Sequence, residues 1–102
     1  MTRYAKRVDN NHAEIRDGIR AERPEVKVWD MSDRGGGILD LAIKCRNGKS
    51  GFLEIKNGDE PLTKLEAQFI SWYPSICGVA RTLPEALAFV DYLISQTAEM
   101  EY

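Results

Sequence analysis

The chain has 102 residues, of which 43% are hydrophobic and 29% charged, and this balance is typical of one small globular domain rather than of a disordered segment. We therefore treat residues 1–102 as a single domain with a core from about residue 11 to residue 94. No apolar run approaches the roughly 18 residues of a transmembrane helix. The N-terminal segment also lacks the apolar stretch of a signal peptide. These observations predict a cytoplasmic protein with no membrane partner. The net charge of −2 argues against a protein that holds nucleic acid by bulk electrostatics alone.

A first helix is predicted near the N-terminus, and Pro24 predicts its end. Its apolar stripe recurs at spacings of three and four and consists of Ala5, Val8, His12, Ile15 and Ile19. A histidine in such a stripe is more often a core residue than a ligand. The start of the helix has two interpretations: residues 9–11 are helix interior, or Asn11 is an N-cap. In the second case Glu14 is the third residue of a capping box rather than a site residue.

Two apolar runs, at residues 37–44 and 51–56, predict a β-hairpin, and a weakly alternating run at residues 26–31 predicts a strand before it. Ionisable residues interrupt the hairpin. They are Asp40 in the first run and Glu54 and Lys56 in the second. A carboxylate in an apolar strand costs free energy unless a metal, a partner or a polar face satisfies it.

The register of this hairpin decides whether its charged residues share a site. A two-residue turn at Asn47-Gly48 places Asp40 and Glu54 on opposite faces of the sheet. A three-residue turn with Gly48 left-handed in a bulge places Asp40 directly opposite Glu54, with Cβ atoms about 5 Å apart. Lys56 shares the face of Glu54 in either register. Only the second register lets both carboxylates hold one divalent cation.

A second helix is predicted to begin with a capping box at Thr63 and Glu66 and to end at Pro74. Its predicted packing face carries Leu65, Phe69, Trp72 and Tyr73. Gln68 lies on the same face, where its amide needs a partner.

A short apolar run at residues 76–80 predicts an interior strand, and a capping box at Thr82 and Glu85 predicts the start of a last helix. The resulting order, α-β-β-β-α-β-α, predicts an α/β fold with a mixed central sheet flanked by helices.

The interrupted hairpin has the residue types needed for phosphodiester hydrolysis. Asp40 and Glu54 would hold Mg²⁺ or Mn²⁺, and the ion would polarise the phosphate and lower the pKa of its water. Lys56 would orient the nucleophile or stabilise the developing charge. Glu14 would add a carboxylate, and Gln68 would position water or the lysine. The structural alternative is a cross-strand ion pair of Asp40 and Lys56, contributing a few tenths of a kcal/mol.

These residues also carry a family resemblance. The pattern Asp40…Glu54-Ile-Lys56 resembles the signature of the PD-(D/E)XK nucleases, with Leu39 where the name of the signature has proline. Residues 36–40, 51–56 and the segment Leu62-Thr…Gln68-Phe…Trp72 resemble the VRR-NUC branch more closely, the virus-type replication-repair nuclease domain. The likeness runs from about Asn11 to about Leu93.

The resemblance implies a restriction-endonuclease-like fold and a Mg²⁺- or Mn²⁺-dependent DNA endonuclease with no organic cofactor. Asp40, Glu54 and Glu14 would be metal ligands, Lys56 the catalytic lysine and Gln68 the helix glutamine. Some stand-alone members of the branch are thought to act as dimers on branched DNA such as four-way (Holliday) junctions, so a homodimer and a branched substrate are expected. The residues expected to contact DNA are Arg7, Arg34, Lys64 and Arg81. An inactive nucleic-acid-binding or assembly module with the same fold is the alternative.

Overall fold

The computed structural model describes residues 2–34 and 36–96, with the backbone alone described for residues 2–10. Its elements are α1 (Thr2–Glu22), β1 (Lys27–Asp30), β2 (Leu41–Lys44), β3 (Ser50–Ile55), α2 (Lys64–Trp72), the 3₁₀ helix η1 (Pro74–Ile76), β4 (Cys77–Ala80) and α3 (Leu83–Ile94). This is the predicted order with one 3₁₀ turn added before β4. In the described part of the chain, no helix combines the length and apolarity that crossing a membrane requires.

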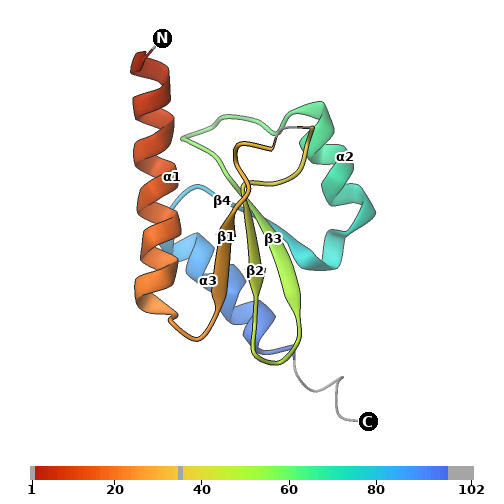
Figure 1. Cartoon of the computed structure of the whole chain (residues 1–102). Helices are drawn as coiled ribbons and strands as arrows, with labels where there is room; N and C mark the ends of the chain where they lie inside the picture. The colour runs from red at the N-terminus through yellow and green to blue at the C-terminus, as the bar shows by residue number, and fades with distance from the viewer. Residues whose placement is uncertain (1, 35, 97–102) are drawn as a thin grey trace.

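The four strands form one mixed sheet in the order β1-β2-β3-β4 (Figure 1). The first three strands are antiparallel neighbours, whereas β4 runs parallel to β3. A parallel neighbour requires a crossover between the two strands, and α2 with η1 supplies it. The mixed α/β architecture predicted from the sequence is therefore confirmed.

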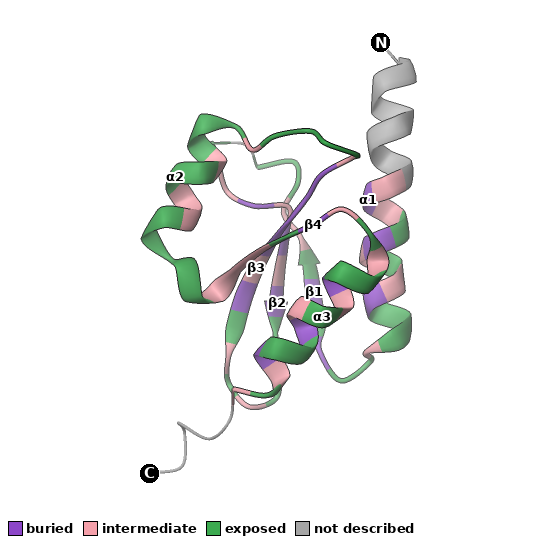
Figure 2. Cartoon of the chain, turned by 180° about the vertical axis from the view of Figure 1, so that it is seen from behind, coloured by how far each residue is buried: buried purple, intermediate pink, exposed green. Residues whose placement is uncertain are grey.

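The hydrophobic core lies between one face of the sheet and two helices, α1 and α3 (Figure 2). Side chains of β3 alternate, so Leu53 is buried in this core while Phe52 faces the other side. Each fully buried aliphatic side chain contributes about 1.5–3 kcal/mol by leaving water. The largest of them are Ile15, Ile19, Leu39, Leu41, Ile43, Leu53, Leu93 and Val90.

Helix α1 continues without a break through residues 9–11. Asn11 is helix interior, so its interpretation as an N-cap is wrong. Its side-chain amide instead donates a hydrogen bond to the carbonyl oxygen of Lys56 at 3.1 Å. Glu14 is accordingly not a capping acid. The helix ends at Glu22, before Pro24, as predicted.

The hairpin adopts the three-residue turn. Leu41 pairs with Leu53, and the ladder continues to the edge of the turn. Gly48 has a φ of 90°, a conformation that residues with a Cβ seldom adopt. Following the same register one step from Leu41 places Asp40 opposite Glu54. Of the two alternatives, this is the one that permits a shared site.

Strand β2 is shorter than predicted, because it begins at Leu41 rather than at residue 37. Asp40 therefore precedes the strand instead of interrupting it. Gly36 and Gly37 have φ values of 70° and 90°, which take the chain out of the extended conformation before β2. The carbonyl oxygen of Asp40 accepts a hydrogen bond from the Met31 amide at 2.7 Å, which fixes the end of this loop beside β1.

The predicted packing face of α2 is largely exposed, and that prediction is wrong. Leu65 is 51% exposed, Trp72 70% and Tyr73 47%. Phe69 alone packs closely on the sheet, edge to face on Phe52 with ring centroids 5.2 Å apart. The sheet opposite α2 therefore covers only part of the apolar face of this helix.

The predicted capping box of α3 is only half formed. The Thr82 hydroxyl accepts a hydrogen bond from the Glu85 amide at 3.3 Å, as expected. The Glu85 carboxylate, however, accepts from the Arg81 amide at 2.7 Å rather than from the capping residue. The helix is still capped at its first turn, with Glu85 near the positive end of its dipole.

Candidate functional site

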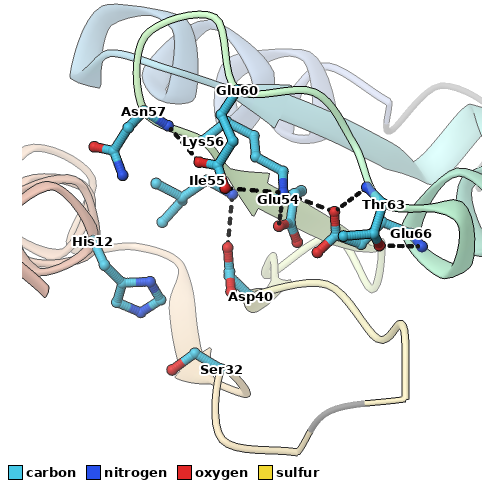
Figure 3. Close-up of a pocket in the computed structure, with 10 residues that line it drawn as sticks. All are labelled: His12, Ser32, Asp40, Glu54, Ile55, Lys56, Asn57, Glu60, Thr63 and Glu66. Carbon is cyan, nitrogen blue, oxygen red and sulfur yellow. Dashed lines mark hydrogen bonds and ion pairs between the residues drawn. The ribbon is translucent and has the colours of Figure 1, made fainter. Parts of the chain in front are cut away.

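A pocket of about 370 Å³ lies between α1, the start of α2, and the chain ends of β2 and β3 (Figure 3). Three predicted site residues, Asp40, Glu54 and Lys56, line it together. Glu54 lies in β3 and Lys56 directly follows this strand, whereas Asp40 precedes β2. The three-residue turn brings Asp40 to the face of the other two. His12 and Glu66 also line the pocket, although neither was predicted as a site residue.

Asp40 is held at the pocket wall by a main-chain donor. Its Oδ2 accepts a hydrogen bond from the Ile55 amide at 2.8 Å. The pairing of β2 with β3 ends at Leu41, and the Ile55 amide of β3 donates to the Asp40 side chain instead. The backbone of β3 therefore orients this carboxylate. Burial raises the pKa of Asp40, although the Ile55 hydrogen bond opposes the rise.

Glu54 is the most constrained carboxylate of the pocket. It is 3% exposed, and its Oε1 is buried with no hydrogen-bond partner among the described residues. Burial first, and then the charge of Asp40, raises the pKa of Glu54 to about 8. Without a cation, Glu54 is therefore mostly protonated at neutral pH.

Lys56 extends a buried ammonium group into the same pocket. Its Nζ lies 2.8 Å from Glu66 Oε1 and 3.5 Å from Glu54 Oε2. Burial alone would lower the pKa of Lys56, but the hydrogen bond to Glu66 and the charge of Glu54 raise it above its usual value. The side chain is consequently a permanent cation at neutral pH.

Glu66 performs two roles at the start of α2. Its carboxylate accepts a hydrogen bond from the Thr63 amide at 2.9 Å in the predicted capping box. Its other role is the contact with Lys56, whereas the sequence predicts that Gln68 positions either water or this lysine. Burial opposes ionisation, but the hydrogen bonds from Lys56 and Thr63 lower the pKa of Glu66, so it remains a carboxylate. The capping box is a sufficient local explanation for a glutamate at this position, so the sequence gives no separate signal that Glu66 lines the pocket.

Gln68 and Glu14 are not brought to the pocket. Gln68 is exposed and borders a separate hollow on α2 with Trp72 and Tyr73. Glu14 is exposed on α1. Residues two apart on a helix point to nearly opposite sides, so α1 presents His12 to the pocket and turns Glu14 away from it.

The four predicted DNA-contacting residues have different surroundings. The side chain of Arg7 lies outside the described residues. Arg34 and Lys64 are exposed, at the loop before β2 and at the first turn of α2. Arg81 is half-buried and donates to two carbonyl oxygens in residues 58–60, at 2.7 and 2.8 Å. It therefore holds the loop that follows β3.

His12 belongs to a hydrogen-bonded cluster at the edge of the pocket. Its Nε2 lies 3.0 Å from Asp30 Oδ2, and the side chain is almost completely buried. Asp30 also accepts hydrogen bonds from Arg16 Nη1 at 2.9 Å and from the amide and hydroxyl of Ser32. Burial opposes ionisation, but these donors hold the pKa of Asp30 well below its usual range. The only sequence signal for this cluster was a polar residue within an apolar stripe.

The pocket offers carboxylate oxygens, the type of ligand that hard divalent cations take. Among the residues with described side chains, no three His, Cys, Asp or Glu side chains form a ready metal cage. Two opposed carboxylates with one orphaned buried oxygen are nevertheless present. Mg²⁺ is commonly held by one or two carboxylates and keeps water or phosphate as its other ligands. Asp40 and Glu54 are the residues that could hold such an ion.

Comparisons of the chain with models of protein families, with curated proteins and with solved structures found no match. The function is therefore inferred from the pocket itself.

Proposed function

We propose that this protein is a metal-dependent DNA endonuclease of the PD-(D/E)XK type that hydrolyses phosphodiester bonds. The observation that carries the proposal is the convergence of Asp40, Glu54 and Lys56 on one pocket, with a Glu54 oxygen left without a partner. A solvated surface or a simple cross-strand ion pair would not bury an acid in this state, because an unpaired buried oxygen costs free energy.

Asp40 and Glu54 would hold Mg²⁺ or Mn²⁺, which when bound supplies a Lewis acid for the phosphate and lowers the pKa of a bound water. The two carboxylates are opposed across the hairpin, and the charge of Asp40 disfavours ionisation of Glu54. A divalent cation relieves this repulsion and satisfies the orphaned Glu54 oxygen. Since Glu54 must release its proton to bind the ion, metal affinity is coupled to pH.

Lys56 would stabilise negative charge on the substrate. Its ammonium is already desolvated and is aimed into the pocket by Glu66 and Glu54. An ordered cation in a water-poor site stabilises developing charge without reorganisation. Because the raised pKa keeps Lys56 protonated, we assign it to phosphate charge and not to proton removal from water.

The architecture supports a restriction-endonuclease-like fold. Its support is the succession of an antiparallel three-stranded meander, a helical crossover and a parallel fourth strand, with α1 and α3 on one face. Arg34 and Lys64 lie on the two segments that border the pocket, where exposed cations would meet the phosphates of a DNA strand. Four-way junctions and other branched DNA are the proposed substrates.

The test is a cleavage panel with four-way junction, flap and linear duplex DNA, each with Mg²⁺, Mn²⁺ or EDTA. We expect metal-dependent cleavage of at least one branched substrate and none in EDTA. DNA binding without metal-dependent cleavage of any substrate would instead support the inactive binding module.

Calorimetry with Mn²⁺ tests the metal site separately. Asp40→Asn retains an acceptor for the Ile55 amide but removes the charge, so it should fold normally and bind Mn²⁺ at least tenfold more weakly. Binding equal to that of the unmodified protein would leave only a structural role for the carboxylate pair.

A further inference from the structure

His12 lines the pocket and does not belong to the hydrophobic core cluster. It reaches from α1 to the pocket wall, on the side facing Asp40 (Figure 3). Only 8% of the residue is exposed, although it lines the pocket. It is also the single histidine of the chain.

Asp30 fixes which nitrogen of the ring carries a proton. The carboxylate is held ionised by Arg16 and Ser32, so it acts only as a hydrogen-bond acceptor. Nε2, at 3.0 Å, must then be the donor in this contact. In the neutral ring, Nδ1 is left with a lone pair, and no described residue donates to it. An imidazole oriented by a carboxylate in this way is a general-base arrangement.

The hydrolysis proposed above requires a proton acceptor that its other residues do not supply. Lys56 is already an ammonium, and Glu66 is bound to it at 2.8 Å. Asp40 and Glu54 are committed to the cation. Glu60 is half exposed, accepts from the Asn57 amide and lies 3.8 Å from Lys56. His12 is therefore the side chain in the pocket with a lone pair available for the proton of water.

We propose that His12 is the general base of this site and that Asp30 is its positioning residue, an inference that rests on the proposed nuclease function. In the step, the water oxygen forms a bond to phosphorus and the bond from phosphorus to the leaving sugar oxygen breaks. The proton of the water passes to Nδ1 of His12, and the leaving oxygen takes a proton from solvent. Asp30 stabilises the imidazolium that forms.

Kinetics of His12 variants test the role in proton transfer. Replacement by Gln or by Ala should lower kcat about 100-fold or more with little change in KM, as expected for the loss of a general base. Free imidazole should restore part of the rate to His12→Ala. It should restore none to Lys56→Met, because that variant lacks the ammonium and not the imidazole. Glu22→Gln, at the exposed end of the same helix, is the matched control and should keep the full rate.

Nuclear magnetic resonance of the single imidazole tests the positioning independently of cleavage. The unmodified protein should show the tautomer protonated at Nε2, and Asp30→Asn should lose that preference and most of kcat. Full activity of both His12 variants, or a tautomer protonated at Nδ1, would overturn this inference while leaving the nuclease proposal intact. Absence of cleavage by the unmodified protein under all metal conditions would overturn both.

Discussion

Among single residues, Glu54 shows most directly how burial and charge set the properties of the pocket. Its carboxyl group is withdrawn from water, faces the charge of Asp40 and has one oxygen without a partner. All three conditions disfavour the ionised form in the absence of a cation. The neighbouring ammonium of Lys56 acts in the opposite direction, but at 3.5 Å it is shared with Glu66. The result is an acid that is mostly protonated at neutral pH in the absence of a cation.

The first prediction concerns stability and pH in the metal-free protein. The pKa of Glu54 is raised to about 8 in the folded state from an ordinary value of 4.5. Its contribution to stability is therefore fully present below about pH 4.5 and is lost as pH rises to about 8, because only the unfolded chain ionises in this window. Glu54→Gln should be the more stable protein by a few kcal/mol above pH 8. Urea unfolding of both proteins at pH 5 and pH 8.5 measures the difference.

In the presence of Mn²⁺, the stability of the folded protein should instead increase with pH. Binding must displace the Glu54 proton, so affinity should increase with pH and proton release should be detectable by calorimetry in buffers of different ionisation enthalpy.

For the metal-free proteins, a stability difference between Glu54→Gln and the unmodified protein that is the same at pH 5 and at pH 8.5 would contradict the raised pKa of Glu54.

The second prediction concerns Lys56. Replacement by Met keeps the aliphatic stem but removes the ammonium, so cleavage should be lost while Mn²⁺ still binds. The change also leaves the Glu66 carboxylate without its cation, which should cost roughly 1–3 kcal/mol of stability. Cleavage assays, calorimetry and urea unfolding measure the three effects.

A double mutant that also changes Glu66 shows whether the loss of stability comes from the broken ion pair. Glu66→Gln combined with Lys56→Met should cost less than the sum of the two single changes, because the half-buried carboxylate that would lack a cation is gone. Cleavage by Lys56→Met at the normal rate would show that the ammonium has no catalytic role.

The sequence predicts the site where residue type and spacing act together, and fails where a residue has a sufficient local explanation. Asp40, Glu54 and Lys56 were predicted because charges in an apolar hairpin have no local justification. The capping box explains Glu66 and the apolar stripe explains His12, so the sequence predicts neither of them as a site residue. What brings both into the pocket is tertiary packing of α1 and α2 beside the sheet, which no local pattern encodes.

At the scale of elements, the hairpin turn shows what the sequence leaves open. An Asn-Gly pair is compatible with both turn lengths, so the register could not be chosen from the sequence. In the structure, the Asn47 amide donates to the carbonyl oxygens of Leu93 and Ile94, both at 3.2 Å. Its side-chain oxygen also accepts from the Lys49 amide at 2.8 Å. A contact with the distant end of α3 therefore accompanies the turn that brings the two carboxylates together.

The third prediction tests the contact between the loop that carries Asp40 and helix α2. Gly37 has a φ of 90°, and a Cβ there would lie 2.6 Å from the Cβ of Leu65. Gly37→Ala should therefore cost roughly 2 kcal/mol or more of stability. It should also weaken Mn²⁺ binding, since relief of the clash moves the loop that positions the carboxylate. Thermal unfolding and calorimetry measure both effects.

Gly36 is the matched control for this change. Its φ is 70°, and a Cβ there would meet nothing within 4 Å, so Gly36→Ala should cost only about 1 kcal/mol from the backbone conformation. Equal losses of stability and metal affinity in the two variants would show that the close approach of loop and helix is unimportant.

At the scale of the whole molecule, one face of the sheet is fully covered and the other is only partly covered. Helices α1 and α3 enclose the core, whereas α2 has no buried residue. The periodicity of α2 could not reveal this, because apolar spacing gives the direction of a helix face but not whether a surface lies opposite it. The mixed α/β architecture was predictable because its order of elements is encoded by caps, glycines and apolar runs within each segment.

The last prediction is that the protein acts as a homodimer. The described part of the chain contributes one pocket of this kind, and cutting two strands of a junction in a single binding event needs two such sites, which a two-fold dimer provides. Light scattering at micromolar concentration should therefore give twice the chain mass of 11.6 kDa. A junction with one strand already nicked should remain a substrate even when one protomer of a mixed dimer carries Asp40→Asn. A mass of one chain at these concentrations, combined with paired cuts in an intact junction, would require two independent binding events and would contradict the dimer.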